Sequence, residues 1–180
     1  MRVGSHSPFN LIIFHLQSLR ILTINVRGLG TARKHDLFLH GLNENLDYDL
    51  FFLQETRISC KTQAVWVAKY FQGQCFWSFG ISKSAGVAIF VSPKFPGNII
   101  CYVHDTDGRI LSLLVDLNSS KFNVINLYAL NTVSDGRLFF IRLHTFFLSH
   151  GDLILGGDFN CIDSNLDRLR IKSDLMLVSP

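Results

Sequence analysis

Polar residues follow apolar segments of the sequence at the points where predicted strands end. They are Asn25, Glu55, Tyr128, Asn131, Asp158 and Asn160. Carboxylate and amide oxygens, such as those of Glu55 and Asn25, are hard ligands that suit a magnesium ion holding several of its waters. Amide and phenol groups can hold phosphoryl oxygens while negative charge builds up on them. These residue types predict metal-assisted chemistry on a phosphate, provided that the fold brings them together.

The segment 156–160 reads Gly-Gly-Asp-Phe-Asn. Asp158 and Asn160 alternate along the chain, so their side chains are expected to project from one side while Phe159 packs on the other. The two glycines, Gly156 and Gly157, predict a sharp, close turn before these residues. Asp158 and Asn160 are therefore predicted to face the same site.

Each of these residues also has an ordinary structural interpretation when it is taken alone. Asn25 is followed by Gly28 and Gly30, which is typical of a turn. Glu55 follows four apolar residues and a glutamine, where a carboxylate often simply ends a strand in solvent. The functional interpretation rests on the combination, because several separate apolar segments end in a residue of suitable chemistry.

The elements that must position these residues are mostly strands. Segments rich in β-branched and aromatic residues, bounded by turn residues, predict strands at 19–25, 49–54, 75–79, 86–91, 99–103, 109–117, 122–128 and 152–157. Apolar residues at helical spacing predict helices at about 31–46, 62–71 and 134–149. This order predicts an α/β (α+β) fold in which mixed β-sheets pack together with helices outside. The polar strand ends are then expected to converge at one edge of the sheets.

Composition limits the class of protein. The chain has 180 residues, of which 48% are hydrophobic and 17% charged, and its net charge is +3. These values exclude a disordered or fibrous protein and allow one sizeable core. Residues 19–180 are predicted to form one domain, with 1–18 as an N-terminal extension. No membrane span is predicted, because no charge-free apolar run reaches 18 residues. The net charge is too small to indicate nucleic-acid binding by itself.

Short strings in the sequence carry a family resemblance. NVRGL, LQET, AGVAIF, NLYALN and GGDFN begin at residues 25, 53, 85, 126 and 156. In this order they resemble the endonuclease/exonuclease/phosphatase superfamily, which is DNase I-like. The chain is most similar to the endonuclease domain of LINE-type non-LTR retrotransposon polyproteins, over about residues 19–168. The resemblance implies a four-layered sandwich of two mixed sheets flanked by helices. It also implies hydrolysis of a phosphodiester in double-stranded DNA with Mg²⁺ or Mn²⁺, and a reverse transcriptase domain as a partner in the full-length polyprotein.

The resemblance further implies a role for each polar residue at the metal and the water. Glu55 is the principal metal ligand, with Asn25 beside it. Asp158 is expected to be catalytic, because it would orient or activate the attacking water.

On the phosphate side, the resemblance implies that Tyr128 and Asn131 contact the scissile or neighbouring phosphate. Asn160 would hydrogen-bond the phosphoryl oxygens as charge develops, so Tyr128 and Asn160 are also candidates for catalysis. Leu130 stands where the family usually has proline, which removes a fixed φ just before Asn131. The resemblance allows Arg109 to approach DNA, but an ordinary arginine that follows a turn and starts a strand explains it at least as well, so Arg109 is not assigned to the site.

The family's further acidic residue and terminal Ser-Asp-His do not follow GGDFN in this chain. The domain is therefore expected to be incomplete at its C-terminus and weakly active or inactive as this fragment. His35, His40, His144 and His150 lie on or beside predicted helices, so none is given a catalytic role. Two alternatives stay open: a small-molecule or lipid phosphoesterase of the same fold, and a non-catalytic truncated remnant.

The four cysteines form no Cys-x-x-Cys pair, and they are predicted to be reduced and mostly buried thiols. Reduced cysteines and a DNA substrate favour a nuclear or cytoplasmic location.

Overall fold

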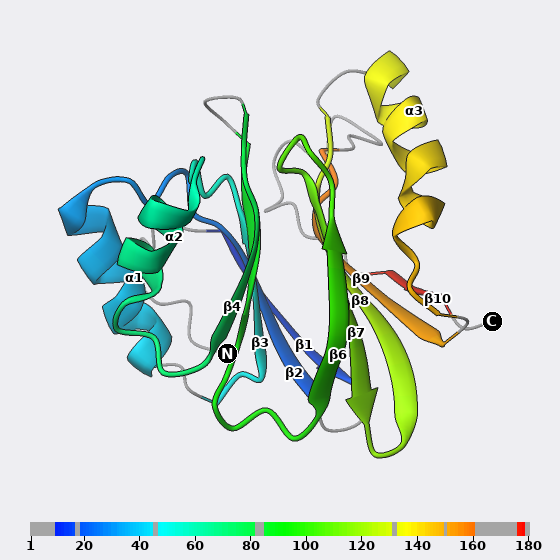
Figure 1. Ribbon diagram of the computed structural model, residues 1–180, viewed down its shortest axis with the longest axis horizontal. Helices are drawn as coiled ribbons and strands as arrows, with labels where there is room; N and C mark the ends of the chain where they lie inside the picture. The colour runs from blue at the N-terminus through cyan, green and yellow to red at the C-terminus, as the bar shows by residue number, and fades with distance from the viewer. Residues whose placement is uncertain are drawn as a thin grey trace.

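Two five-stranded β-sheets face each other, and helices cover their outer faces (Figure 1). The computed structural model describes residues 10–16, 19–44, 47–81, 85–130, 133–149, 151–160 and 176–178. In the first sheet the strand order is β1-β2-β3-β5-β4, and in the second it is β10-β9-β8-β7-β6. With α1 and α2 on one side and α3 on the other, the molecule has the four layers that the resemblance implied.

The first sheet and its helices come from the N-terminal half of the chain. Its strands are β1 (Asn10–Leu16), β2 (Leu19–Asn25), β3 (Leu50–Gln54), β4 (Gln74–Ser78) and β5 (Val87–Val91). The helices are α1 (Ala32–Glu44) and α2 (Lys61–Ala68).

The second sheet follows in the chain. Its strands are β6 (Asn98–His104), β7 (Ile110–Leu117), β8 (Ser120–Tyr128), β9 (Asp152–Asp158) and β10 (Met176–Val178). Helix α3 (Val133–Leu143) and a short 3₁₀ helix, η1 (His144–Phe146), lie between β8 and β9.

Each sheet contains one parallel pair of strands, and the other described pairs are antiparallel. Strands β2 and β3 run parallel because α1 carries the chain back between them, and α3 does the same for β8 and β9. In register, Asn25 pairs with Gln54 and Tyr128 pairs with Asp158. The carboxyl ends of each parallel pair therefore finish level with each other.

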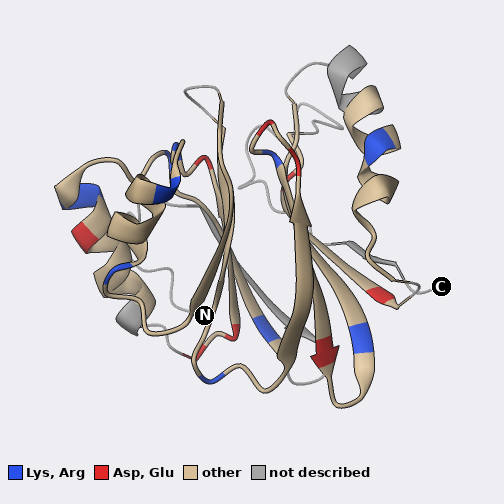
Figure 2. Cartoon of the chain, viewed as in Figure 1, with Lys and Arg blue, Asp and Glu red and all other residues tan. Residues whose placement is uncertain are grey.

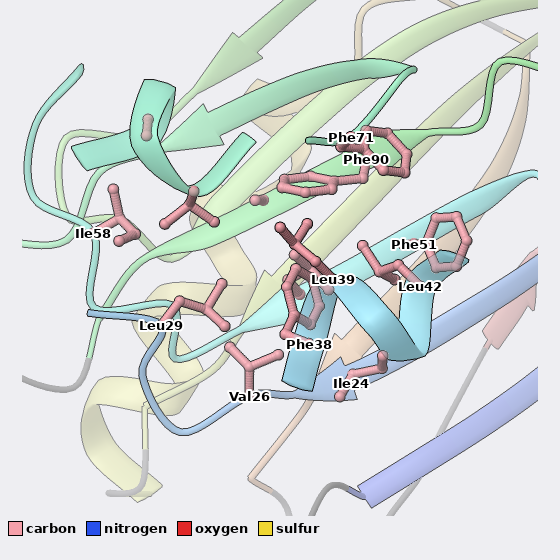
Figure 3. Close-up of a cluster of buried hydrophobic side chains, with 14 of the residues drawn as sticks. Ile24, Val26, Leu29, Phe38, Leu39, Leu42, Phe51, Ile58, Phe71 and Phe90 are labelled. Atoms are coloured by element: carbon pink, nitrogen blue, oxygen red, sulfur yellow. The ribbon is translucent and has the colours of Figure 1, made fainter. Parts of the chain in front are cut away.

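Apolar side chains fill the spaces between all four layers. In β3, Leu50 and Phe52 pack against the second sheet, whereas Phe51 and Leu53 pack under the helices. A strand that is buried on both faces reads as a continuous apolar run, which is why LFFL lacks polar alternation. Figure 3 shows the cluster between the first sheet and its helices, where Phe38 of α1 lies close to residues of the sheet. A third cluster lies between the second sheet and α3.

The structure corrects the predicted elements at both ends. Within the predicted extension, Asn10–Leu16 forms β1 and pairs antiparallel with β2. Its sequence, NLIIFHL, is rich in strand-forming residues, and the polar Asn10 and His15 are compatible with a strand at the edge of a sheet. Met176–Val178, where no strand was predicted, forms β10 beside β9.

Smaller differences concern the third helix, the glycine pair and the cysteines. The predicted helix at 134–149 ends earlier, because α3 finishes at Leu143 and η1 follows. Gly156 and Gly157 lie inside β9 and do not form a turn. The thiols are not mostly buried: among the described cysteines, Cys60 and Cys101 are exposed and Cys75 is half-buried. In the described part of the chain, no helix is long and apolar enough to cross a membrane.

Candidate active site

The polar strand ends of both sheets meet at one end of the sandwich. Asn25 is the last residue of β2, and Glu55 follows the last residue of β3. Tyr128 and Asp158 are the last residues of β8 and β9. Figure 2 shows charged residues near both ends of the two sheets, and those at the upper ends lie beyond long stretches of strand that carry no charge.

Hydrogen bonds between side chains join four of the six predicted site residues. Asn25 Nδ2 donates to Glu55 Oε1 at 2.9 Å and to Asp158 Oδ2 at 3.2 Å. Tyr128 Oη donates to Glu55 Oε1 at 3.0 Å. Because Asn25 and Glu55 belong to the first sheet while Tyr128 and Asp158 belong to the second, the cluster spans the gap between the sheets.

Asn160 bonds to this cluster through its backbone, whereas its side chain bonds to Ala129, directly after β8. Its backbone N–H donates to Asp158 Oδ1 at 3.1 Å, and its side-chain Nδ2 donates to the carbonyl oxygen of Ala129 at 2.7 Å. Phe159 packs in the apolar cluster under α3, on the opposite side, as the alternation predicted. Asn131, the remaining candidate, lies outside the described residues.

The backbone around the two carboxylates is strained. Arg27, Glu55, Arg57 and Asn160 have φ between 49° and 56°, in the left-handed region. This conformation costs an L-residue roughly 1–2 kcal/mol. Such strain gathers at functional sites, where the surrounding structure enforces it.

Backbone hydrogen bonds hold the strained segment from both sides. Gly28 N–H donates to the carbonyl of Glu55 at 2.7 Å, and Thr56 N–H donates to the carbonyl of Gly86 at 2.9 Å. The loop after β2 and the segment before β5 thus fix the conformation of Glu55, and with it the direction of its carboxylate.

Two arginines that the sequence did not assign to the site are close to it. Arg57 Nη2 lies 3.4 Å from Glu55 Oε2. The guanidinium of Arg109 lies over the ring of Tyr128, 5.1 Å from its centroid, and donates to the Tyr128 carbonyl oxygen at 3.3 Å. The pairing of β7 with the end of β8 brings Arg109 there, and spacing along the chain does not reveal that contact.

Arg109 also lines a cavity of about 430 Å³ between α3 and the end of the second sheet. Its walls are largely apolar, with Ile110, Leu130 and Phe139 among them. Neither Glu55 nor Asp158 lines this cavity, and Arg109 connects it to the site because the same guanidinium lies over Tyr128.

Tyr128 is held in its neutral form. Burial raises the pKa of its phenol to about 12, and the neighbouring Glu55 and Asp158 carboxylates add to the increase, while Arg109 opposes it. The phenol therefore keeps its proton at neutral pH and acts as a hydrogen-bond donor.

The donor set fits a hard divalent cation. Glu55 and Asp158 bring carboxylates from opposite sheets to one shared amide. The described residues contain no group of three or more His, Cys, Asp or Glu side chains that could hold a metal. A protein site for Mg²⁺ typically has only one or two carboxylate ligands, because the ion keeps several of its bound waters. Asn25 turns its nitrogen toward the carboxylates and its Oδ1 accepts from Arg27 N–H at 3.2 Å, so in this arrangement it bridges the carboxylates as a donor.

His35 and His144, which the sequence placed on or beside helices, have surroundings other than Glu55 and Asp158. His35 is buried, with Nε2 3.0 Å from the carbonyl oxygen of Val67 and its ring stacked on Trp66. His144 is exposed on η1. His150 lies outside the described residues.

The fold and the site define a class: a four-layered α/β sandwich with a carboxylate, amide and phenol cluster where the strands of both sheets end. The chain belongs to the Endonuclease/Exonuclease/phosphatase family, whose sequence model matches residues 22–177. A curated relative, the Transposon TX1 uncharacterized 149 kDa protein of Xenopus laevis, is 29% identical over 167 residues. That match covers 89% of this chain and 13% of the relative.

Solved structures share the fold. The catalytic domain of Xenopus laevis APE2 matches with a TM-score of 0.61 and 18% identity, over 81% of this chain and 62% of that one. The 3'-5' exonuclease NExo of Neisseria meningitidis matches with a TM-score of 0.61 and 22% identity, over 82% and 60%. TDP2 of D. rerio, complexed with a single-strand DNA product, matches with a TM-score of 0.60 and 18% identity, over 84% and 64%. The chain thus spans about three fifths of these structures.

Proposed function

We propose that this chain is a divalent-metal-dependent phosphodiesterase that nicks double-stranded DNA, of the kind found in non-LTR retrotransposon proteins. The observation that carries the proposal is the cluster of Glu55, Asn25, Tyr128 and Asp158, in which two carboxylates from different sheets share one amide. Membership of the family supports hydrolysis of a phosphoester. The transposon relative supports DNA as the substrate, and a reverse transcriptase domain would lie outside the matched 13% of such a protein.

In this proposal some side chains bind the phosphate and another binds the attacking water. Tyr128 is neutral, and its one phenolic hydrogen, which bonds to Glu55 in the free protein, transfers its hydrogen bond to a phosphoryl oxygen when substrate binds. Asp158 accepts a proton of the attacking water and so aligns it with phosphorus, the role of a general base or positioned acceptor. Arg109, on the ring of Tyr128, adds positive charge beside the phosphate.

A divalent cation held by Glu55 would neutralise charge on the phosphate and on the leaving oxygen. Asn25 keeps Glu55 and Asp158 at a fixed separation, because its amide donates to both. Asn160 fixes the end of β8 through Ala129, which maintains the position of Tyr128. Asn131 is retained as a proposed phosphate contact.

The test is a nicking assay on supercoiled plasmid with Mg²⁺, followed to long times because the sequence predicts weak activity. The wild type should convert supercoiled to open-circular DNA, and Glu55→Gln and Asp158→Asn should each abolish this conversion. Asp152→Asn is the matched control, because Asp152 is exposed at the opposite end of β9. Equal nicking by the wild type and Glu55→Gln would overturn the proposal.

The same preparation distinguishes the alternatives. Hydrolysis of an inositol phosphate or of sphingomyelin, without nicking, would assign the site to a small-molecule or lipid phosphoesterase. Absence of hydrolysis of every substrate, together with absence of Mg²⁺ binding by calorimetry, would identify a non-catalytic remnant.

A further inference from the structure

A buried polar bridge joins the two sheets directly beneath the candidate site. Gln54 Nε2 donates to Asn126 Oδ1 at 2.7 Å and to Thr23 Oγ1 at 3.0 Å. Asn126 Nδ2 donates to the carbonyl oxygens of Leu53 at 3.0 Å and Ala88 at 2.9 Å. The three residues Thr23, Gln54 and Asn126, here called the inter-sheet bridge, are at most 2% exposed.

Every member of the inter-sheet bridge lies one or two residues before a residue of the site. Thr23 precedes Asn25 by two positions on β2, and Asn126 precedes Tyr128 by two on β8. Residues two apart on a strand project from the same face, so these pairs point into the space between the sheets. Gln54 is the last residue of β3, immediately before Glu55.

The inter-sheet bridge is polar in a layer that is otherwise apolar. Its neighbours between the sheets include Phe52, Ile89, Leu113 and Val124. Burying an amide costs free energy unless its donors and acceptors are satisfied, and apolar side chains of similar size would fill the space without this cost. The bridge is therefore not explained by packing alone.

Directional hydrogen bonds constrain the offset of the sheets in a way that apolar contacts do not. Asn126 of the second sheet donates to Leu53 on β3 and Ala88 on β5, neighbouring strands of the first sheet. It also accepts from Gln54. These three bonds can be satisfied together at only one offset between the sheets, and at that offset Tyr128 Oη reaches Glu55 Oε1.

We propose that Gln54 and Asn126 are positioning residues, which set the offset between the two sheets that assembles the catalytic cluster. The consequence for catalysis rests on the proposed nuclease function. The consequence for the contact between Tyr128 and Glu55 does not depend on it.

The test is the double variant Gln54→Met/Asn126→Leu, which replaces both amides with apolar side chains of similar size. Replacing both partners leaves neither side-chain amide unpaired, whereas the carbonyl oxygens of Leu53 and Ala88 lose the donor that Asn126 supplies. The double variant is therefore expected to fold with lower stability than the wild type. Its free energy of unfolding in urea establishes this before the site is measured.

The first readout is the contact itself, followed by NMR on protein carrying ¹³C-labelled tyrosine and glutamate, with Tyr128→Phe used for assignment. In the wild type Tyr128 Oη lies 3.0 Å from Glu55 Oε1, so an NOE should join the two side chains. In the folded double variant this NOE should be lost, because the offset between the sheets is no longer fixed. This readout does not require an active enzyme, so it remains informative if the nicking assay fails.

The second readout is the rate of nicking by the double variant. Its kcat should fall on the order of 100-fold with little change in KM, because a displacement of catalytic groups by about 1 Å produces a loss of this size. The matched control is Asn123→Leu. Asn123 is also a buried asparagine on β8, but it bonds to Ser149 and Gly151 and does not reach the first sheet. Asn123→Leu should lower stability and leave the NOE between Tyr128 and Glu55 unchanged.

A folded double variant that retains the NOE between Tyr128 and Glu55 would overturn the proposal. So would an Asn123→Leu variant that loses this NOE as the double variant does.

Discussion

Tyr128 donates its phenolic hydrogen to Glu55 Oε1 at 3.0 Å, across the space between two sheets. The two residues are 73 positions apart in the chain: Tyr128 ends β8 of the second sheet, and Glu55 directly follows β3 of the first. This contact therefore depends on how the two sheets pack against each other.

The phenol of Tyr128 should make stability depend on pH in the alkaline range. Its pKa is raised from 10 in the unfolded chain to about 12 in the folded one, so folding favours the neutral form. This contribution is complete below pH 10 and is lost as the pH rises from 10 toward 12. Tyr128→Phe should be less stable than the wild type at pH 8, by about 1–2 kcal/mol for a lost hydrogen bond to a carboxylate.

At pH 11 the difference between Tyr128→Phe and the wild type should be smaller, as measured by urea unfolding. Burial also raises the pKa of Cys75 to about 12, and that of Tyr48 is raised too, but both groups are present in both proteins and cancel. A difference that stays the same from pH 8 to pH 11 would contradict the prediction.

Removing the charge of Glu55 should weaken the binding of Mg²⁺ much more than removing the side chain of Asn160. Glu55→Gln takes a negative charge from the proposed ligand set, whereas Asn160 donates to the Ala129 carbonyl and contributes no charge. We expect affinity to fall by about tenfold or more in Glu55→Gln.

Calorimetric titration with Mg²⁺ would measure these affinities, and the rise in Tm with added Mg²⁺ gives an independent reading. Glu55→Gln should show little rise, and Asn160→Ala a rise close to that of the wild type. Equal affinities in the two variants would remove Glu55 from the ligand set.

Gly157 should tolerate no side chain. Its φ is 137°, and a Cβ at this position would lie 1.9 Å from the carbonyl oxygen of Leu127 on the neighbouring strand β8. Gly157→Ala must push β8 and β9 apart next to Tyr128 and Asp158, at a cost of about 3 kcal/mol. Gly30→Ala is the control, since a Cβ at Gly30 would meet nothing within 4 Å. Urea unfolding would show the idea to be wrong if both variants were equally stable.

The cysteines should differ in reactivity according to exposure and pKa. Cys60 and Cys101 are exposed, whereas burial raises the pKa of the Cys75 thiol to about 12. Since the thiolate is the reactive form, iodoacetamide at pH 8 should label Cys60 and Cys101 much faster than Cys75. Peptide mass spectrometry resolves each site, including Cys161. Equal labelling of Cys75 would show that β4 opens readily.

Much of the fold could be predicted because apolar runs and turn residues determine where strands begin and end through residues that are close in the sequence. The strand ending at Asn25 and the run before Glu55 were placed within a residue of their observed bounds. Convergence of Asn25, Glu55, Tyr128 and Asp158 followed from strand ends alone, since parallel pairing places such ends at one edge.

Long-range contacts could not be predicted in this way. Arg109 reaches Tyr128 only because β7 pairs with β8, and no spacing in the sequence encodes that contact. Gly157 was predicted to serve a turn, whereas its role is the close approach of β8. In the sequence Gln54 and Asn126 are ordinary polar residues of two strands, and only the packing of the two sheets brings them into contact.

The described strands of the first sheet all come from residues 10–91, and those of the second from 98–178, so each sheet is continuous in the chain. Glu55 belongs to the first half and Asp158 to the second. A break in the connecting segment 92–97 would divide the protein into two pieces. Each piece would carry one of the two site carboxylates, Glu55 or Asp158, and the apolar face of one sheet. The site would then exist only when the two halves reassemble, which makes this molecule a natural candidate for a split-protein reporter.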